Sequence, residues 1–273
     1  MTNVCKISVV MPCFNHGAFV REAVDSIRAI GRSDVELIVV DDGSTDARTA
    51  EEMDKLAGEG IRVIRQANRG LAGARNAGIE AARGDYIFPL DADDRMRGDW
   101  IDRAMRLLDS DAAVGIVYGD AQCFGTRADC WRVGPFDADR LLEANFIHAS
   151  ALYRKTVWEQ NGGYDGTMPV QGLEDWDFWL GALEQGWQFT YVPEVFFDYR
   201  QAAGSMISRA ARHTDAINEF VARKHGPMYR NAWIRLARER QSATRTARRL
   251  GTLLKVRAGQ GLNKSARMSW VPD

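Results

Sequence analysis

This 273-residue sequence has only four cysteines and no long hydrophobic run. Cys5, Cys13, Cys123 and Cys130 form no C-x-x-C pair, so we expect free thiols in a reducing cytoplasm, with a Cys123–Cys130 bridge as the less favoured alternative. No apolar stretch approaches the roughly 20 residues that span a bilayer, and residues 1–16 lack the apolar segment of a signal peptide. These absences predict a cytoplasmic protein without a disulfide framework or a transmembrane helix.

The charge is unevenly distributed, although the whole chain carries a formal net charge of only −1. Residues 209–273 hold 15 Lys and Arg against four Asp and Glu, a balance of +11. Residues 1–208 hold 21 basic and 33 acidic residues, a balance of −12. We therefore expect an acidic globular domain over 1–208 and a basic helical extension over 209–273.

Strand and helix patterns alternate along the first hundred residues, which predicts βαβ units and a parallel sheet. Apolar, β-branched runs predict strands over 6–11, 35–40, 61–64 and 86–90, and helical spacing predicts helices over 17–30, 47–57 and 70–83. Further along, strands are expected at 114–124 and 195–200, with helices over 172–187 and 206–257. The fold class is α/β, Rossmann-like, with a mostly parallel sheet flanked by helices and a C-terminal helical extension.

Polar clusters follow three of the predicted strands, at residues 12–16 (PCFNH), 41–46 (DDGSTD) and 91–94 (DADD). In open α/β sheets, ligands bind outside the carboxyl ends of the strands. We therefore expect the three clusters to meet at one rim of the sheet.

The DADD cluster places three carboxylates within four positions. Asp91 and Asp93 are two residues apart, so in extended chain both side chains point the same way and can face one ion. Carboxylate oxygens suit Mg²⁺ or Mn²⁺. The alternative is a solvated acidic turn with Asp94 capping a following helix, and this stretch alone leaves both interpretations open.

Four motifs in order make a stronger signal: VVDDGSTD (39–46), GLAGARNAGI (70–79), PLDADD (89–94) and EDWDFW (174–179). Over residues 6–205 the chain resembles the family 2 glycosyltransferases, which have the GT-A fold. The resemblance implies an inverting enzyme with a nucleotide-sugar donor, usually of UDP. It also implies that Asp91 and Asp93 hold Mn²⁺ or Mg²⁺ against the donor diphosphate.

The same resemblance assigns donor contacts to five more residues. Asp41 would accept a hydrogen bond from the base, and Pro12 and Phe14 would line the nucleoside site, with Phe14 replacing the commoner Tyr. Arg75 would lie near the nucleotide, with a surface ion pair as the alternative. Arg200 matches a basic position near the leaving diphosphate, in a loop that continues to Ser205 and would close over the donor.

The acidic pair at 174–175 is the predicted catalytic site. The resemblance makes Asp175 the general base that deprotonates the acceptor hydroxyl, with Glu174 as its neighbour or an acceptor contact. Trp176 and Trp179 would give apolar surroundings and pack on a sugar ring. The alternative, which we would prefer without the family pattern, is a helix start with stabilising acids and core tryptophans.

Two other functions are compatible with some of these residues. A haloacid dehalogenase-like phosphatase also places D-x-D after an apolar strand, but it has no counterpart of the ARNAG segment. A non-catalytic nucleotide-sugar-binding module is the third alternative. The expected acceptor is a sugar or a lipid-linked acceptor, and by analogy the process is bacterial surface polysaccharide synthesis.

The basic extension interleaves arginines with leucines, as a basic amphipathic helix does. It would hold the enzyme on an anionic membrane, peripherally on the inner face. Packing on the acidic domain and a homodimer contact are the alternatives. We expect no nucleic acid, because the extension's aromatics are too sparse for a stacking platform. They are Phe220, Tyr229, Trp233 and Trp270.

Overall fold

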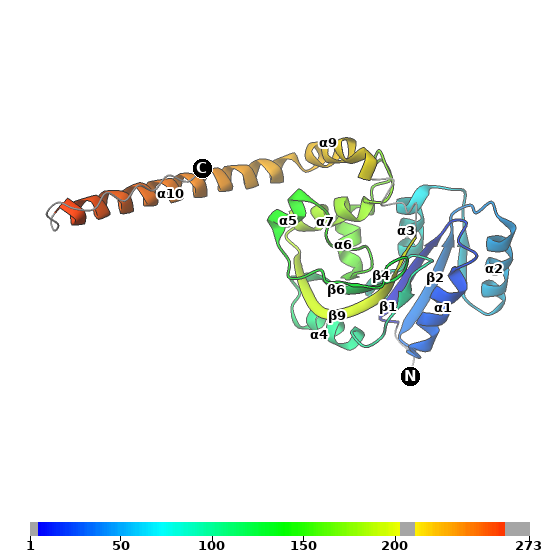
Figure 1. Ribbon diagram of the computed structural model, residues 1–273. Helices are drawn as coiled ribbons and strands as arrows, with labels where there is room; N and C mark the ends of the chain where they lie inside the picture. Colours follow the sequence, from blue (N-terminus) through cyan, green and yellow to red (C-terminus); the bar gives the residue numbers. More distant parts are fainter. Residues whose placement is uncertain (1–4, 203–210, 260–273) are drawn as a thin grey trace. The chain divides into compact units, whose positions relative to one another are not determined.

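The computed structural model describes residues 5–202 and 211–259 (Figure 1). The chain divides into two compact units, Met1–His225 and Gly226–Asp273. The predicted donor loop around Ser205 and the aromatic residue Trp270 lie outside the described residues. All four cysteines are free, as predicted.

The first unit alternates strands and helices as expected from the sequence. Its strands are β1 (Ile7–Cys13), β2 (Val35–Asp41), β3 (Arg62–Arg65), β4 (Tyr86–Pro89), β5 (Arg95–Met96), β6 (Val114–Gly125), β7 (Cys130–Trp131), β8 (Leu152–Arg154) and β9 (Gln188–Gln201). Its helices are α1 (Val20–Ala29), α2 (Ala47–Gly58), α3 (Gly70–Glu80), α4 (Ile101–Ser110), α5 (Ala138–Glu143), α6 (Lys155–Asn161), α7 (Glu174–Glu184), the short 3₁₀ helix η1 (Ala211–His213) and α9 (Thr214–Lys224). The second unit contains one long helix, α10 (Gly226–Gly259).

The strands form one mixed sheet in the order β3-β2-β1-β4-β8-β6-β9-β5, with β7 paired to β6. The four strands from the first ninety residues lie side by side in the order β3-β2-β1-β4 and are all parallel, as predicted. β8 then pairs antiparallel with both β4 and β6, so the sheet as a whole is mixed. β4 ends at Pro89, which has no N–H to donate to a neighbouring strand.

The core lies on both faces of β1, because its side chains alternate. Ile7, Val9 and Met11 belong to the cluster that includes buried residues of α1, α2 and α4. On the opposite face, α3 lies very close to the sheet at Gly78. A Cβ added there would lie 2.4 Å from Cγ1 of Val10. The missing side chain therefore lets α3 approach the sheet and fixes the position of the residues it carries.

The tryptophans of α7 are core residues. Trp176 is 4% exposed and its indole N–H donates to the Leu141 carbonyl at 2.7 Å. Trp179 is fully buried and donates to the Ile147 carbonyl at 3.0 Å. Neither face is open to a sugar ring, so the predicted sugar contact is wrong and the core alternative holds. Both side chains instead anchor the start of α7.

Ion pairs at the end of helix α9 connect it to α7. His225 lies between two carboxylates, with Nε2 at 3.0 Å from Asp177 and Nδ1 at 2.9 Å from Glu184. Lys224 reaches Asp177 at 2.8 Å and Asp165 at 2.6 Å. These contacts explain why the first unit extends to His225.

Candidate active site

The three polar clusters meet at the carboxyl ends of β1, β2 and β4, as predicted. Asn15 has a positive φ of 57°, and its side-chain oxygen accepts from the Thr45 N–H at 2.8 Å. Its own N–H donates to the Ser44 hydroxyl at 3.0 Å, which joins the first cluster to the second. His16 Nδ1 lies 3.9 Å from Asp93 Oδ1 and joins the first cluster to the third. These contacts assemble one rim from segments almost eighty residues apart.

Arg75 connects the acidic residues that follow β4 with those that begin α7. Its side chain is 2% exposed, and its guanidinium pairs with Asp91 at 2.9 Å and with Glu174. The pair with Glu174 spans 99 positions of sequence. Glu174 also accepts from the Gly172 N–H at 2.8 Å. Arg75 is therefore a buried bridge, and the predicted alternative of a surface ion pair is wrong.

Like charge is concentrated around Asp94. This side chain is 1% exposed, and Oδ1 accepts from the Arg200 N–H at 2.8 Å, whereas Oδ2 is buried without a hydrogen-bond partner. Burial, followed by the charges of Asp91 and Asp93, raises the pKa of Asp94 well above its usual value. Asp94 caps no helix, because the next helix begins at Ile101. The predicted helix cap is wrong, and Asp94 points into the cluster instead.

The neighbouring acids respond in opposite directions. Burial, and then the charge of Asp91, raises the pKa of Asp93. Burial also opposes ionisation of Asp91, but the charge of Arg75 outweighs it and holds the pKa of Asp91 below its usual value. Of these three carboxylates, Asp91 therefore ionises most readily. Asp93 and Asp94 ionise less readily, because the neighbouring negative charges are not fully compensated.

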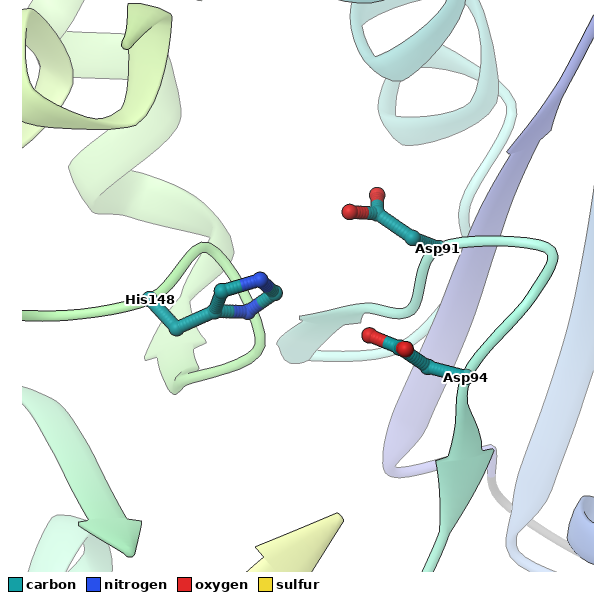
Figure 2. A group of neighbouring side chains, drawn as sticks. All are labelled: Asp91, Asp94 and His148. Carbon is teal, nitrogen blue, oxygen red and sulfur yellow. The ribbon is translucent and has the colours of Figure 1, made fainter. Parts of the chain in front are cut away.

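Asp91, Asp94 and His148 converge on one point (Figure 2). One ligand atom from each lies within 4.8 Å of the others. Burial lowers the pKa of His148 to about 4, so the ring is neutral at neutral pH. The unpartnered oxygen of Asp94 and two carboxylates beside a neutral imidazole fit a divalent cation.

The Nδ1 atom of His148 accepts the Ser150 N–H at 3.0 Å. The proton of the neutral ring therefore lies on Nε2. Ligation through Nε2 requires this proton to move to Nδ1, which ends the bond from Ser150. Asp91 and Asp94 can bind a cation without such a proton shift, so they are better ligands than His148 in this arrangement.

Asp175 begins α7 beside Glu174, and both side chains are buried. Oδ1 of Asp175 accepts the Trp176 N–H at 2.9 Å. Burial, and then the charge of Glu174, raises the pKa of Asp175 to about 7, against the opposing charge of Arg75. A carboxylate with a pKa near neutrality can take and return a proton at neutral pH.

The remaining predicted donor residues lie along the rim. Phe14 is 45% exposed, as a residue that packs on a ligand must be, whereas Pro12 is buried within β1. Asp41 ends β2, and its Oδ1 accepts the Ser44 N–H at 3.0 Å.

Arg200 is held by several partners beneath the acidic turn. It pairs with Glu22, and its Nε donates to the Asp93 carbonyl at 2.8 Å. Its guanidinium also lies 4.6 Å from the ring centroid of Phe19 and 4.3 Å from that of Phe124. These contacts stabilise the turn at residues 91–94, while the predicted donor contact of Arg200 stays a prediction.

An aromatic wall that sequence reasoning missed stands beside the acids. We define it as Trp131, His148 and Tyr199, which are partly exposed. The His148 ring centroid lies 5.0 Å from that of Tyr199 and 6.2 Å from that of Trp131. Burial, and then the charges of Asp94 and Asp91, raises the pKa of Tyr199. No motif or spacing marks these residues in the sequence.

Comparison with known proteins places this geometry in a family. The model of the family described as "Glycosyl transferase family 2" matches residues 8–167. A "PGL/p-HBAD biosynthesis glycosyltransferase" of Mycobacterium bovis is 32% identical over 72% of this chain and 77% of its own length. The chain spans only about a quarter of the length of two other curated relatives, 26% and 22%.

Solved structures share the fold at lower identity. S. aureus TarS in complex with UDP-GlcNAc has a TM-score of 0.61 and 18% identity, over 74% of this chain and 60% of its own. The mannosyltransferase PcManGT from Pyrobaculum calidifontis, in complex with GDP-Man and Mn²⁺, has a TM-score of 0.57 and 22% identity, over 76% of this chain and 60% of its own. Both are GT-A-type glycosyltransferases, which confirms the predicted fold class.

Proposed function

The chain belongs to glycosyl transferase family 2, and on this premise we propose that it is a metal-dependent, inverting glycosyltransferase. It takes a sugar from a nucleotide donor and transfers it to a hydroxyl acceptor. The observation that carries the proposal is the buried Asp175, with a pKa of about 7, joined through Glu174 and Arg75 to the acidic turn. Family membership sets aside the phosphatase alternative.

Asp175 is the general base in this proposal. Its carboxylate, which accepts the Trp176 N–H at Oδ1, receives the proton of the acceptor hydroxyl. The acceptor oxygen then forms a bond to the anomeric carbon. The bond from that carbon to the diphosphate breaks, and its electron pair leaves with the nucleoside diphosphate. Glu174 is fixed to Arg75 and serves as a positioning residue for the base.

Asp91 and Asp94 would hold the cation, together with Asp93 as the sequence predicts. When bound, a divalent cation acts as a Lewis acid that stabilises charge on the departing diphosphate. Arg75 orients Asp91 toward the site, and the Arg200 N–H orients Asp94. Support for a cation comes from the unpartnered Oδ2 of Asp94, and a solved structure of the same fold is a complex with Mn²⁺.

The donor is a nucleotide sugar, with UDP as the expected nucleotide. Exposed Phe14 would pack on the base, and the free oxygen of Asp41 would accept its N–H. The aromatic wall of Trp131, His148 and Tyr199 offers partly apolar ring faces for a pyranose acceptor, free or lipid-linked. By analogy with the family, we extend the proposal to a role in bacterial surface polysaccharide synthesis, in the cytoplasm.

Calorimetric titration of the full chain with a panel of UDP and GDP sugars, with Mn²⁺ or with EDTA, tests the proposal. At least one donor should bind with Mn²⁺ and lose at least tenfold in affinity with EDTA. Asp93→Asn and Asp94→Asn should reproduce the EDTA result. Asp54→Asn, at an exposed acid of α2, is the matched control and should bind like wild type. Binding of no donor, or binding that ignores both the cation and the variants, would contradict the proposal.

A second measurement separates an enzyme from a binding module. Release of nucleoside diphosphate from the bound donor, in the presence of a panel of sugar acceptors, should depend on Asp175. Donor binding without any release, even to water, would instead support the non-catalytic alternative.

A further inference from the structure

Helix α10 presents apolar side chains to solvent. In the described part of the chain, the exposed large hydrophobic residues are Phe14, Trp233 and Leu236, and the last two lie on α10. Trp233 is 70% exposed and Leu236 is 49% exposed. They are three positions apart, so they lie on the same side of the helix. The rim site accounts for Phe14, whereas the proposed reaction uses neither residue of α10.

A helix of this kind needs a partner. Most helical stability in proteins comes from packing an apolar face, and isolated helices are marginal in water. α10 runs for 34 residues, and no other helix or strand of its compact unit is described. No helix among the described residues is both long enough and apolar enough to cross a membrane. We therefore look for a partner that covers the Trp233–Leu236 side of α10 and leaves its polar side in water.

The charge of α10 selects among the partners. Residues 226–259 hold nine Lys and Arg against one acid, Glu239, a balance of +8. A second copy would bring an equal positive charge against the first, which disfavours self-association through this helix. With 3.6 residues per turn, exposed Arg238 and Arg245 lie roughly opposite the Trp233–Leu236 side, and exposed Arg230 flanks it. The positive balance of the helix, with Arg230 beside its apolar side, favours a broad, negatively charged surface.

We infer that α10 lies on an anionic lipid surface, with Trp233 and Leu236 inserted at the level of the headgroups. Trp favours that boundary because its ring is apolar and its N–H is polar. Arg230, beside the inserted side, reaches lipid phosphates, and Arg240, one turn beyond Leu236 on that side, extends its charged end toward the headgroups past its apolar stem. The inference stands apart from the proposed transfer reaction, because it requires binding alone.

Vesicle flotation of the full chain tests this inference. Vesicles of phosphatidylcholine with about a third phosphatidylglycerol should carry the protein, and vesicles of phosphatidylcholine alone should not. Binding should fall as salt rises, because exposed charges are screened.

Two double variants with the same charge change separate the apolar side from the charge. Trp233→Glu with Leu236→Glu should reduce the partition coefficient at least tenfold. Asn231→Glu with Gln241→Glu, at exposed positions on the polar side, should reduce it about threefold or less. Equal far-UV circular dichroism of the two variants shows that the helix persists in both.

Three results would overturn the inference. A full chain that stays in the unbound fraction with anionic vesicles at low salt would show that α10 does not bind lipid. Equal losses in both double variants would show that charge alone attracts the helix. A dimer in light scattering that dissociates in Trp233→Glu with Leu236→Glu, without vesicle binding, would make this side a contact between copies.

Discussion

Replacing Arg75 by Met should reveal the free energy stored in the buried bridge. Met approximates the length and the apolar stem of Arg75 but offers no charge. The change leaves Glu174 buried without its charged partner, and Asp91 without the contact at 2.9 Å. Glu174 is 3% exposed, so water cannot replace the guanidinium there.

The expected cost is set mainly by Glu174. Removing one partner of a buried ion pair typically destabilises a protein by about 3–5 kcal/mol. Asp91 is 29% exposed, so solvent screens its share. A loss of about 3–5 kcal/mol corresponds to roughly two to three and a half orders of magnitude in the folding equilibrium, at about 1.4 kcal/mol per tenfold.

The cost should depend on pH with a definite sign. Arg75 holds the pKa of Asp91 below its usual value, so this contribution is present above the unfolded pKa and is lost as pH falls. Arg75 also lowers the pKa of Asp175, which burial has raised to about 7. Without Arg75, the acids resist ionisation more strongly. The deficit of the variant should therefore be largest near pH 8 and smallest near pH 4.5.

Urea unfolding of wild type and Arg75→Met at both pH values measures this difference. The double variant Arg75→Met with Glu174→Gln is the control, because Gln keeps an oxygen for the Gly172 N–H without the stranded charge. It should recover part of the lost stability at pH 8 and little at pH 4.5. A deficit under about 1 kcal/mol, or one equal at both pH values and unchanged by Glu174→Gln, would refute a charged bridge.

Three further predictions concern other acids and one histidine. Asp175→Asn should reduce transfer at least about 10²-fold while sparing donor affinity. The rise of the wild-type transfer rate through about pH 7 should disappear in this variant. Near-normal turnover would show that another residue is the base. Asp94→Asn should raise the midpoint of urea unfolding in EDTA, because it replaces a buried carboxylate that has an unpartnered oxygen with an uncharged amide. A lower midpoint would mean that the protein compensates the charge of Asp94. His225→Gln should destabilise the protein more at pH 6 than at pH 9, since Asp177 and Glu184 raise the pKa of His225 against burial, and stability from a raised pKa fades as pH rises. An equal loss at both pH values would show that the ring contributes by packing alone.

Much of the parallel part of the fold could be predicted from the sequence. β2 was expected over 35–40 and runs over Val35–Asp41, and α3 was expected from Gly70 and begins there. Both follow from strong local patterns bounded by polar or glycine residues. The antiparallel pairing of β8 could not be predicted, because three residues between a buried loop and a helix carry no period. Their pairing is decided by the neighbours β4 and β6.

The candidate site could be predicted only in part, because some of its residues are brought together by tertiary packing rather than by local sequence pattern. Motif spacing drew attention to Asp91, Glu174 and Asp175, which are polar residues at the ends of apolar elements. It gave no hint that Arg75 is buried, because a helix with small residues on most sides has no marked apolar face. His148 lies in an irregular segment between α5 and β8 and is brought to Asp94 by tertiary packing alone. Long-range placement of this kind has no local signature.

The charge balance at the rim explains why the proposed cation belongs to the donor site. Five carboxylates gather there, at Asp91, Asp93, Asp94, Glu174 and Asp175. Among the described residues, two arginines contact these acids: Arg75 pairs with both Asp91 and Glu174, and Arg200 also pairs with Glu22, outside the group. Buried like charges without compensation raise each other's pKa, as Asp93 and Asp94 do. A diphosphate would add negative charge to a rim that already lacks positive charge. A divalent cation held by Asp91 and Asp94 would answer both needs, because its charge would compensate the acids and attract a diphosphate.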